Sequence, residues 1–161
     1  RIARAADVRC IVNPAPYSPD AAGLDALADI LTPNESEFAA LLRPFGEDLD
    51  ADAISAMRPE SLHGLAAKLP CPDIVITLGG RGALLSTPYG FHEFSPPAVA
   101  VSDTTGAGDC FNGALAAELA HGAPLPDACA FAVKAASCKV ERAGAALAMP
   151  TRTDIRLRFP G

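Results

Sequence analysis

Three small residues followed by an aspartate form the part of the sequence best suited to chemistry. Gly106, Ala107 and Gly108 precede an apolar helical pattern and carry no bulky side chain, so a ligand can approach their backbone closely. The free N–H groups of a first helical turn can then form an anion site. Asp109 would repel a bound phosphate, which makes sense if its task is to take a proton from an attacking hydroxyl. A glycine-rich loop with Asp109 as a helix cap explains the same residues equally well.

This loop does not match the common phosphate-binding patterns. It has neither the G-x-x-x-x-G-K-[ST] spacing nor the G-x-G-x-x-G spacing, and no lysine stands where a P-loop has one. Any phosphoryl transfer here must therefore use an anion hole together with a metal ion.

Asn34 and Glu37 are a second candidate pair. They lie three residues apart on one face of an expected helix, so both can reach the hydration shell of one Mg²⁺ ion. Acidic residues in a first turn also suit the helix dipole. Taken alone, the pair favours plain N-terminal capping over metal binding.

Short apolar runs alternate with alanine-rich helical stretches around these residues. The expected strands are residues 8–12, 30–31, 74–78, 83–86 and 90–94, the last two at a sheet edge. The expected helices are residues 20–28 with Asp20 as N-cap, 34–42, 61–69, the later part of 104–121, and 127–141. Residues 43–59 predict a surface segment with some helix. Residues 1–6 predict the last turns of a helix. The tail after Pro150 is weakly patterned.

This alternation predicts an α/β layer fold, with helices on both faces of a mainly parallel sheet. The near-continuous apolar run at residues 74–78 indicates a strand that is buried on both faces. With 161 residues and no evident linker, residues 1–161 are expected to form a single domain, because domains usually run to about 100–200 residues.

The composition excludes several classes of protein. Half of the residues are hydrophobic and a fifth are charged, which excludes a disordered chain. A net charge of −6 without a basic run argues against nucleic-acid binding. No apolar run approaches the roughly 20 residues that span a bilayer, so no membrane partner is expected. The five cysteines form no C-x-x-C pair and favour buried thiols in a reducing, cytoplasmic compartment.

Four ordered stretches and a partial fifth resemble the motifs of the ribokinase family, the PfkB-type carbohydrate kinases. They are N-P-A-P at residues 13–16, T-P-N-E-S-E at 32–37, T-L-G-G-R-G at 77–82 and D-T-T-G-A-G-D at 103–109. R-A-G-A at 142–145 and M-P at 149–150 resemble the closing motif, except that Ala148 stands where serine is usual. The resemblance implies a three-layer ribokinase-like α/β fold and ATP-dependent phosphorylation of a primary hydroxyl of a sugar.

The resemblance also assigns roles to the residues of these motifs. Asp109 would be the general base that contacts the substrate hydroxyl, and the amides of Gly106, Ala107 and Gly108 would hold the transferring phosphoryl charge. Glu37 would bind Mg²⁺ through water. The implied nucleotide site comprises Asn34, Thr77, Leu78, Gly79, Gly80, Arg81 and Gly82, together with Gly108 and Asp109.

A monovalent cation site, for K⁺, is also implied by the resemblance. The Asp103 side chain and the Thr105 carbonyl would form one half of it. The other half would be backbone carbonyls near Lys139, Arg142, Gly144 and Ala148. Because carbonyls do this binding, the alanine at position 148 need not abolish it. Residues 130–134 would offer mainly apolar contacts to adenine, where the family often has Asn or His.

The matched motifs belong to the second, nucleotide-binding half of the family's fold. We therefore expect the chain to be the C-terminal portion of a kinase domain, with the sugar-binding loops outside it. The N-P-A-P stretch favours ribose as the substrate. The alternatives are a nucleotide-binding remnant without catalysis, or a kinase of fructose, a nucleoside or hydroxymethylpyrimidine. The expected partners are ATP and a small sugar. A homodimer is expected of the full-length family, and self-association or aggregation of an isolated half with an unpaired sheet edge.

Overall fold

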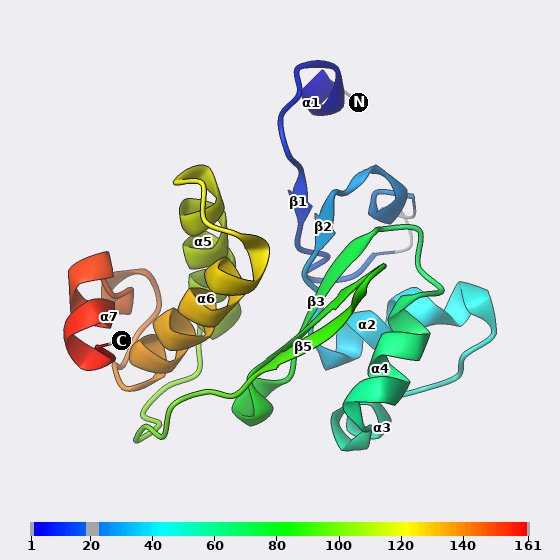
Figure 1. The fold of residues 1–161 in the computed structure, drawn as a ribbon. Coiled ribbons are helices and arrows are strands. Elements are labelled where there is room, and N and C mark those ends of the chain that lie inside the picture. The colour runs from blue at the N-terminus through cyan, green and yellow to red at the C-terminus, as the bar shows by residue number, and fades with distance from the viewer. Residues whose placement is uncertain (1, 19–22, 161) are drawn as a thin grey trace. The chain divides into compact units, whose positions relative to one another are not determined.

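The computed structural model describes residues 2–18 and 23–160, which divide into two compact units (Figure 1). The first unit comprises Arg1–Gly79 and Ala83–Glu93, and the second comprises Gly80–Gly82 and Phe94–Gly161. The expectation of a single domain stays a prediction.

The first unit is built on a five-stranded sheet in the order β1-β2-β3-β4-β5. The strands are β1 (Ile11–Val12), β2 (Ile30–Leu31), β3 (Asp73–Thr77), β4 (Ala83–Thr87) and β5 (Gly90–Phe94). The β1/β2 and β2/β3 pairs are parallel, whereas β3 and β4 are antiparallel. The sheet is therefore mixed rather than mainly parallel, because the short connection between β3 and β4 can only reverse the chain, and a parallel crossover needs about a dozen residues or more.

Three helices cover one face of this sheet. They are α2 (Glu35–Leu42), α3 (Ala51–Ala56) and α4 (Pro59–Ala66). The shared core comprises Leu31, Ile74, Ile76 and Leu84 from the strands with Phe38, Leu42, Ile54 and Leu62 from the helices. Val75 of β3 points to the opposite face and is also buried, which confirms the expected burial of this strand on both sides.

The N-terminal part differs from the sequence prediction in two places. The strand expected over residues 8–12 is reduced to Ile11–Val12, after the short helix α1 (Ile2–Ala5). A single turn of 3₁₀ helix, Asp25–Leu27, stands in the region where a longer helix was expected over 20–28. The proposed cap of that helix, Asp20, lies outside the described residues.

The second unit contains a helical pair and a short third helix. The elements are α5 (Ala107–Ala120), α6 (Leu125–Val140), a 3₁₀ turn at Ala146–Ala148 and α7 (Arg152–Arg158). Cys110, Ala135, Cys138 and Ile155 form their shared core. The tail after Pro150, for which the weak sequence pattern gave no prediction, contains α7, and Thr151 and Asp154 form the capping box that starts this helix.

The described part of the chain bears on the membrane-spanning segments and the cysteines considered from composition. None of its helices is long and apolar enough to cross a membrane. Four cysteines are buried as free thiols, namely Cys71, Cys110, Cys129 and Cys138, while Cys10 is half-buried. Burial raises the pKa of the Cys71 and Cys110 thiols to about 11, so both stay protonated at neutral pH.

Candidate functional site

The start of α2 is tied to the end of β3. Residues Asn34 and Thr77 form an isolated parallel bridge just beyond the strands. The carbonyl oxygen of Pro33 accepts from the Thr77 amide at 2.9 Å and from the Thr77 hydroxyl at 3.4 Å. Two segments that the sequence marked as candidate nucleotide contacts are thus neighbours in the first unit.

The predicted capping by Asn34 and Glu37 is present in full. The Asn34 Oδ1 atom accepts from the Glu37 amide at 2.9 Å, and the Asn34 amide donates to Glu37 Oε2 at 2.9 Å. Glu37 is only 7% exposed. This capping box fixes the entry of the chain into α2 and orients the carboxylate of Glu37.

The residues of the glycine turn after β3 differ in burial and in the space around them. Leu78 packs into the core of the first unit, so its side chain is structural and only its backbone remains for a ligand. Gly79–Arg81 form a 3₁₀ turn with exposed residues. A Cβ atom at Gly82 would lie 1.9 Å from the Phe94 carbonyl oxygen, so only glycine fits there.

The candidate anion hole is formed by the loop that leads into α5. Gly106 is the N-cap, with a φ of 76° that side chains rarely tolerate. The Ala107 amide donates to the Thr104 carbonyl at 3.1 Å, so it is already used within the loop. Among the described residues, no acceptor engages the amides of Gly106 and Gly108. Two of the three predicted amides are therefore available to an anion.

Asp109 lies in the first turn of α5 and is exposed. Gly106 takes the N-cap position of this helix, so Asp109 is not the N-cap residue. A Cβ atom placed on Gly106 would lie 3.8 Å from Asp109 Oδ2, so the carboxylate stands close to the available amides. The arrangement places a carboxylate beside backbone amides that can donate to an anion.

Asp103 holds the loop before α5 against the segment after α6. Its Oδ1 accepts from the Thr105 amide at 2.8 Å and its Oδ2 from the Gly144 amide at 2.8 Å. The bonds from Thr105, then that from Gly144, and the nearby Lys139 charge lower the pKa of Asp103 to about 2. Asp103 is thus ionised and fully engaged at neutral pH.

The residues predicted to supply carbonyls to K⁺ differ in their contacts and burial. The Lys139 carbonyl accepts from the Arg142 amide at 2.9 Å. The Arg142 guanidinium reaches Asp154 at 3.4 Å, and Ala148 is buried with its amide on the Ala145 carbonyl at 3.0 Å. The structure therefore gathers Asp103, Thr105, Lys139 and Gly144 around one loop.

The Lys139 side chain is the feature that sequence reasoning missed. It is fully buried, and its Nζ donates to the Asp103 carbonyl oxygen at 2.8 Å. A signal was present in the sequence, because Lys139 continues the spacing of the buried residues Ala128, Ala132 and Ala135 along α6.

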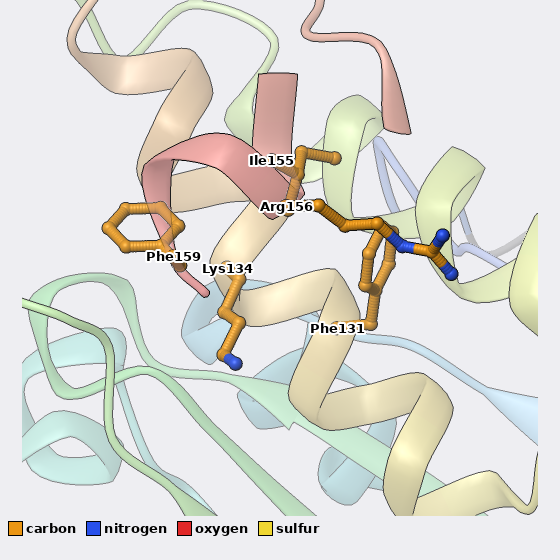
Figure 2. A pocket seen from close by; sticks show the side chains of 5 residues that line it. All are labelled: Phe131, Lys134, Ile155, Arg156 and Phe159. Carbon is orange, nitrogen blue, oxygen red and sulfur yellow. The ribbon is translucent and has the colours of Figure 1, made fainter. Parts of the chain in front are cut away.

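A separate cavity of about 370 Å³ lies between α6 and α7 (Figure 2). Phe131, Lys134, Ile155, Arg156 and Phe159 line it. Phe131 and Lys134 belong to the stretch expected to meet adenine. None of the motif residues lines this cavity.

Comparison with known proteins places these features in a family. The pfkB family of carbohydrate kinases matches residues 1–152. Ribokinase of Schizosaccharomyces pombe is 33% identical over 156 residues, which are 96% of this chain and 48% of that protein. The bifunctional protein HldE of Shewanella sp. (strain ANA-3) is 39% identical over 119 residues, which are 73% of this chain and 23% of that protein. The chain thus spans about half the length of the ribokinase it matches.

Solved structures of ribokinases and a related kinase share the fold. Ribokinase of Cryptococcus neoformans var. grubii in complex with ADP matches with a TM-score of 0.80 and 26% identity, over 96% of this chain and 54% of that one. Ribokinase of Arabidopsis thaliana with ribose and ATP matches with a TM-score of 0.73 and 29% identity, over 94% of this chain and 47% of that one. Phosphofructokinase-2 of Escherichia coli with potassium matches with a TM-score of 0.76 and 25% identity, over 96% of this chain and 48% of that one. These matches confirm the predicted ribokinase-like α/β fold.

Proposed function

Because the chain belongs to the pfkB family of carbohydrate kinases, we propose that it provides the phosphate-binding loop and the general base of an ATP-dependent sugar kinase. The observation that carries the proposal is the N-terminus of α5. There Gly106 adopts a left-handed conformation, two amides are available, and the exposed Asp109 lies in the first turn without being the N-cap residue. Such a helix start suits a phosphoryl group, and the carboxylate beside it suits a proton acceptor.

In the proposed reaction, the Asp109 carboxylate takes the proton of a primary hydroxyl of the sugar. The hydroxyl oxygen forms a bond to the γ-phosphorus of ATP, while the bond from that phosphorus to the β–γ bridging oxygen breaks. ADP leaves with the electron pair of the broken bond. The amides of Gly106 and Gly108 would donate to the phosphoryl oxygens, where negative charge lies during transfer.

Glu37 is the residue proposed to hold Mg²⁺. Its capping bond engages Oε2, and the second carboxylate oxygen can accept from a metal-bound water. Mg²⁺ usually keeps several waters and needs only one or two carboxylates, so this single donor fits it better than a dedicated cage would. Bound Mg²⁺ would neutralise charge on the phosphate oxygens.

ATP and ribose are the proposed substrates. The Arabidopsis ribokinase structure contains both, and the Cryptococcus structure contains ADP. Matches to phosphofructokinase-2 and to HldE keep other sugars as alternatives. The potassium in the phosphofructokinase-2 structure supports a cation site in the family.

Titration calorimetry with Mg-ATP, followed by an assay of ADP release, tests the proposal. We expect Mg-ATP to bind and ribose to raise ADP release above the rate with fructose or no sugar. Binding that does not depend on Gly106 would contradict the phosphate-loop assignment. Binding without phosphorylation of any sugar would favour a nucleotide-binding remnant.

A further inference from the structure

The loop that holds Asp103 contains a cation supplied by the chain itself. Lys139 is 0% exposed, and its Nζ donates to the Asp103 carbonyl oxygen at 2.8 Å. Lysine is almost never fully buried unless its charge is compensated. The function proposed above assigns nothing to this side chain.

The compensating charge is the Asp103 carboxylate. Both of its oxygens accept backbone amides, from Thr105 and Gly144. Asp103 and Lys139 together are therefore neutral. A potassium ion added to the same group would leave an excess positive charge beside a buried ammonium, and like charges at such short range repel strongly.

One of the carbonyl groups expected to bind K⁺ is also engaged by the chain. The Lys139 carbonyl accepts the Arg142 amide at 2.9 Å. The neighbouring Val140 carbonyl accepts the amides of Ser102 at 2.7 Å and of Asp103 at 3.1 Å. These bonds fix the loop at the end of α6, so the loop is ordered by groups within the chain.

We propose that the Lys139 ammonium takes the place of a monovalent cation at this loop. Lys139 is thus a positioning residue: it holds the Asp103 carbonyl, and through the loop it aims Gly106 and Asp109. K⁺ would then be unnecessary for order in the loop. The inference concerns the loop of the proposed kinase, but its test needs neither ATP nor turnover.

The experiment compares the thermal unfolding of the chain in KCl, NaCl and choline chloride at equal ionic strength. Binding of Tl⁺, which mimics K⁺, is followed in parallel by thallium NMR. We expect the wild-type midpoint to be the same in the three salts, with no bound Tl⁺ signal. A potassium-specific rise of the midpoint, or a bound Tl⁺ signal, would overturn the proposal.

Substitutions at position 139 separate replacement of a cation from simple packing. Lys139→Ala removes the ammonium and leaves space, so we expect a lower midpoint of thermal unfolding. We expect K⁺ to raise this midpoint and choline to leave it unchanged. Lys139→Arg keeps the charge and should respond to none of the salts. Lys134→Ala removes the same charge from the same helix and should show no selectivity for K⁺. A Lys139→Ala variant that is insensitive to K⁺ would mean that Lys139 only fills space. If this variant does not fold, the wild-type and Lys139→Arg measurements still decide the question.

Discussion

The Pro33 carbonyl oxygen accepts two hydrogen bonds from Thr77, one from its amide at 2.9 Å and one from its hydroxyl at 3.4 Å. This single acceptor joins the residue before the cap of α2 to the last residue of β3. Parallel strands place their carboxyl ends at one edge of a sheet, which is where α/β proteins bind ligands. The pairing brings two motifs that are far apart in sequence together at this edge of the sheet.

Replacing Thr77 by valine tests this connection. Thr77→Val keeps the amide bond and the β-branched shape but removes the hydroxyl, so we expect the free energy of unfolding to fall by about 1 kcal/mol. Mg-ATP binding should weaken, because the cap of α2 is less firmly held. Thr87→Val removes the hydroxyl bond to Gly90 at the other end of β4 and should cost stability without changing the affinity. Equal Mg-ATP affinities in calorimetry for both variants would contradict the assignment of Thr77 to the nucleotide site.

Asp109→Asn tests the proposed general base. The amide has the same size but cannot accept the proton, so kcat should fall by roughly 10²–10⁴. Mg-ATP affinity should change little, since the anion loop stays intact. Asp127→Asn is the matched control, because Asp127 is also exposed in the first turn of a helix. Turnover of Asp109→Asn within about threefold of wild type would leave no catalytic role for this carboxylate.

The helices with clear start signals were predictable from the sequence. The T-P-N-E-S-E stretch predicted α2 because Asn34 and Glu37 can cap each other, and they do so. The small residues before α5 likewise predicted its start. By contrast, α7 is seven residues long and was missed, since its stability depends on contacts such as the 2.7 Å ion pair between Arg152 and Glu118. Tertiary contacts of this kind leave no periodic pattern in the sequence.

The candidate site was predictable in its residue types but not in its bonds. The spacing of Asn34 and Glu37 could not decide between capping and metal binding, and the structure shows that capping is present. The buried Lys139 was missed because a lysine is exposed by default. Its burial depends on Asp103, which is 36 residues away in sequence. Only the folded chain brings these two residues together.

The stability that Asp103 contributes should depend on pH. The folded-state pKa of Asp103 is lowered to about 2 from an ordinary value of 3.8, chiefly by the Thr105 amide. A depressed pKa means that the contribution is present above the ordinary value and is lost as the pH falls towards 2. The difference in unfolding free energy between wild type and Asp103→Asn should therefore be constant near neutrality and shrink between pH 4 and 2. Chemical unfolding at a series of pH values measures it, and a difference that stays constant down to pH 2 would contradict the assignment.

Gly106→Ala tests the geometry of the anion loop. A Cβ atom at this position would lie 3.2 Å from the Met149 Cε atom, and the φ of 76° is strained for any side chain. Left-handed conformation costs about 1–2 kcal/mol per non-glycine residue, so we expect a loss of stability of that size. Mg-ATP binding should weaken as well, because the amides of the turn would no longer point at one anion.

Gly113→Ala provides the control for Gly106→Ala within the same helix. Gly113 lies in the interior of α5, and a Cβ atom there would meet nothing within 4 Å. Alanine should therefore stabilise the helix by roughly 0.5–1 kcal/mol, opposite in sign to the change at Gly106, and leave Mg-ATP binding unchanged. Thermal unfolding and calorimetry on both variants measure the two effects. If Gly106→Ala were as stable as Gly113→Ala and bound Mg-ATP equally well, the left-handed turn would have no part in holding the phosphoryl group.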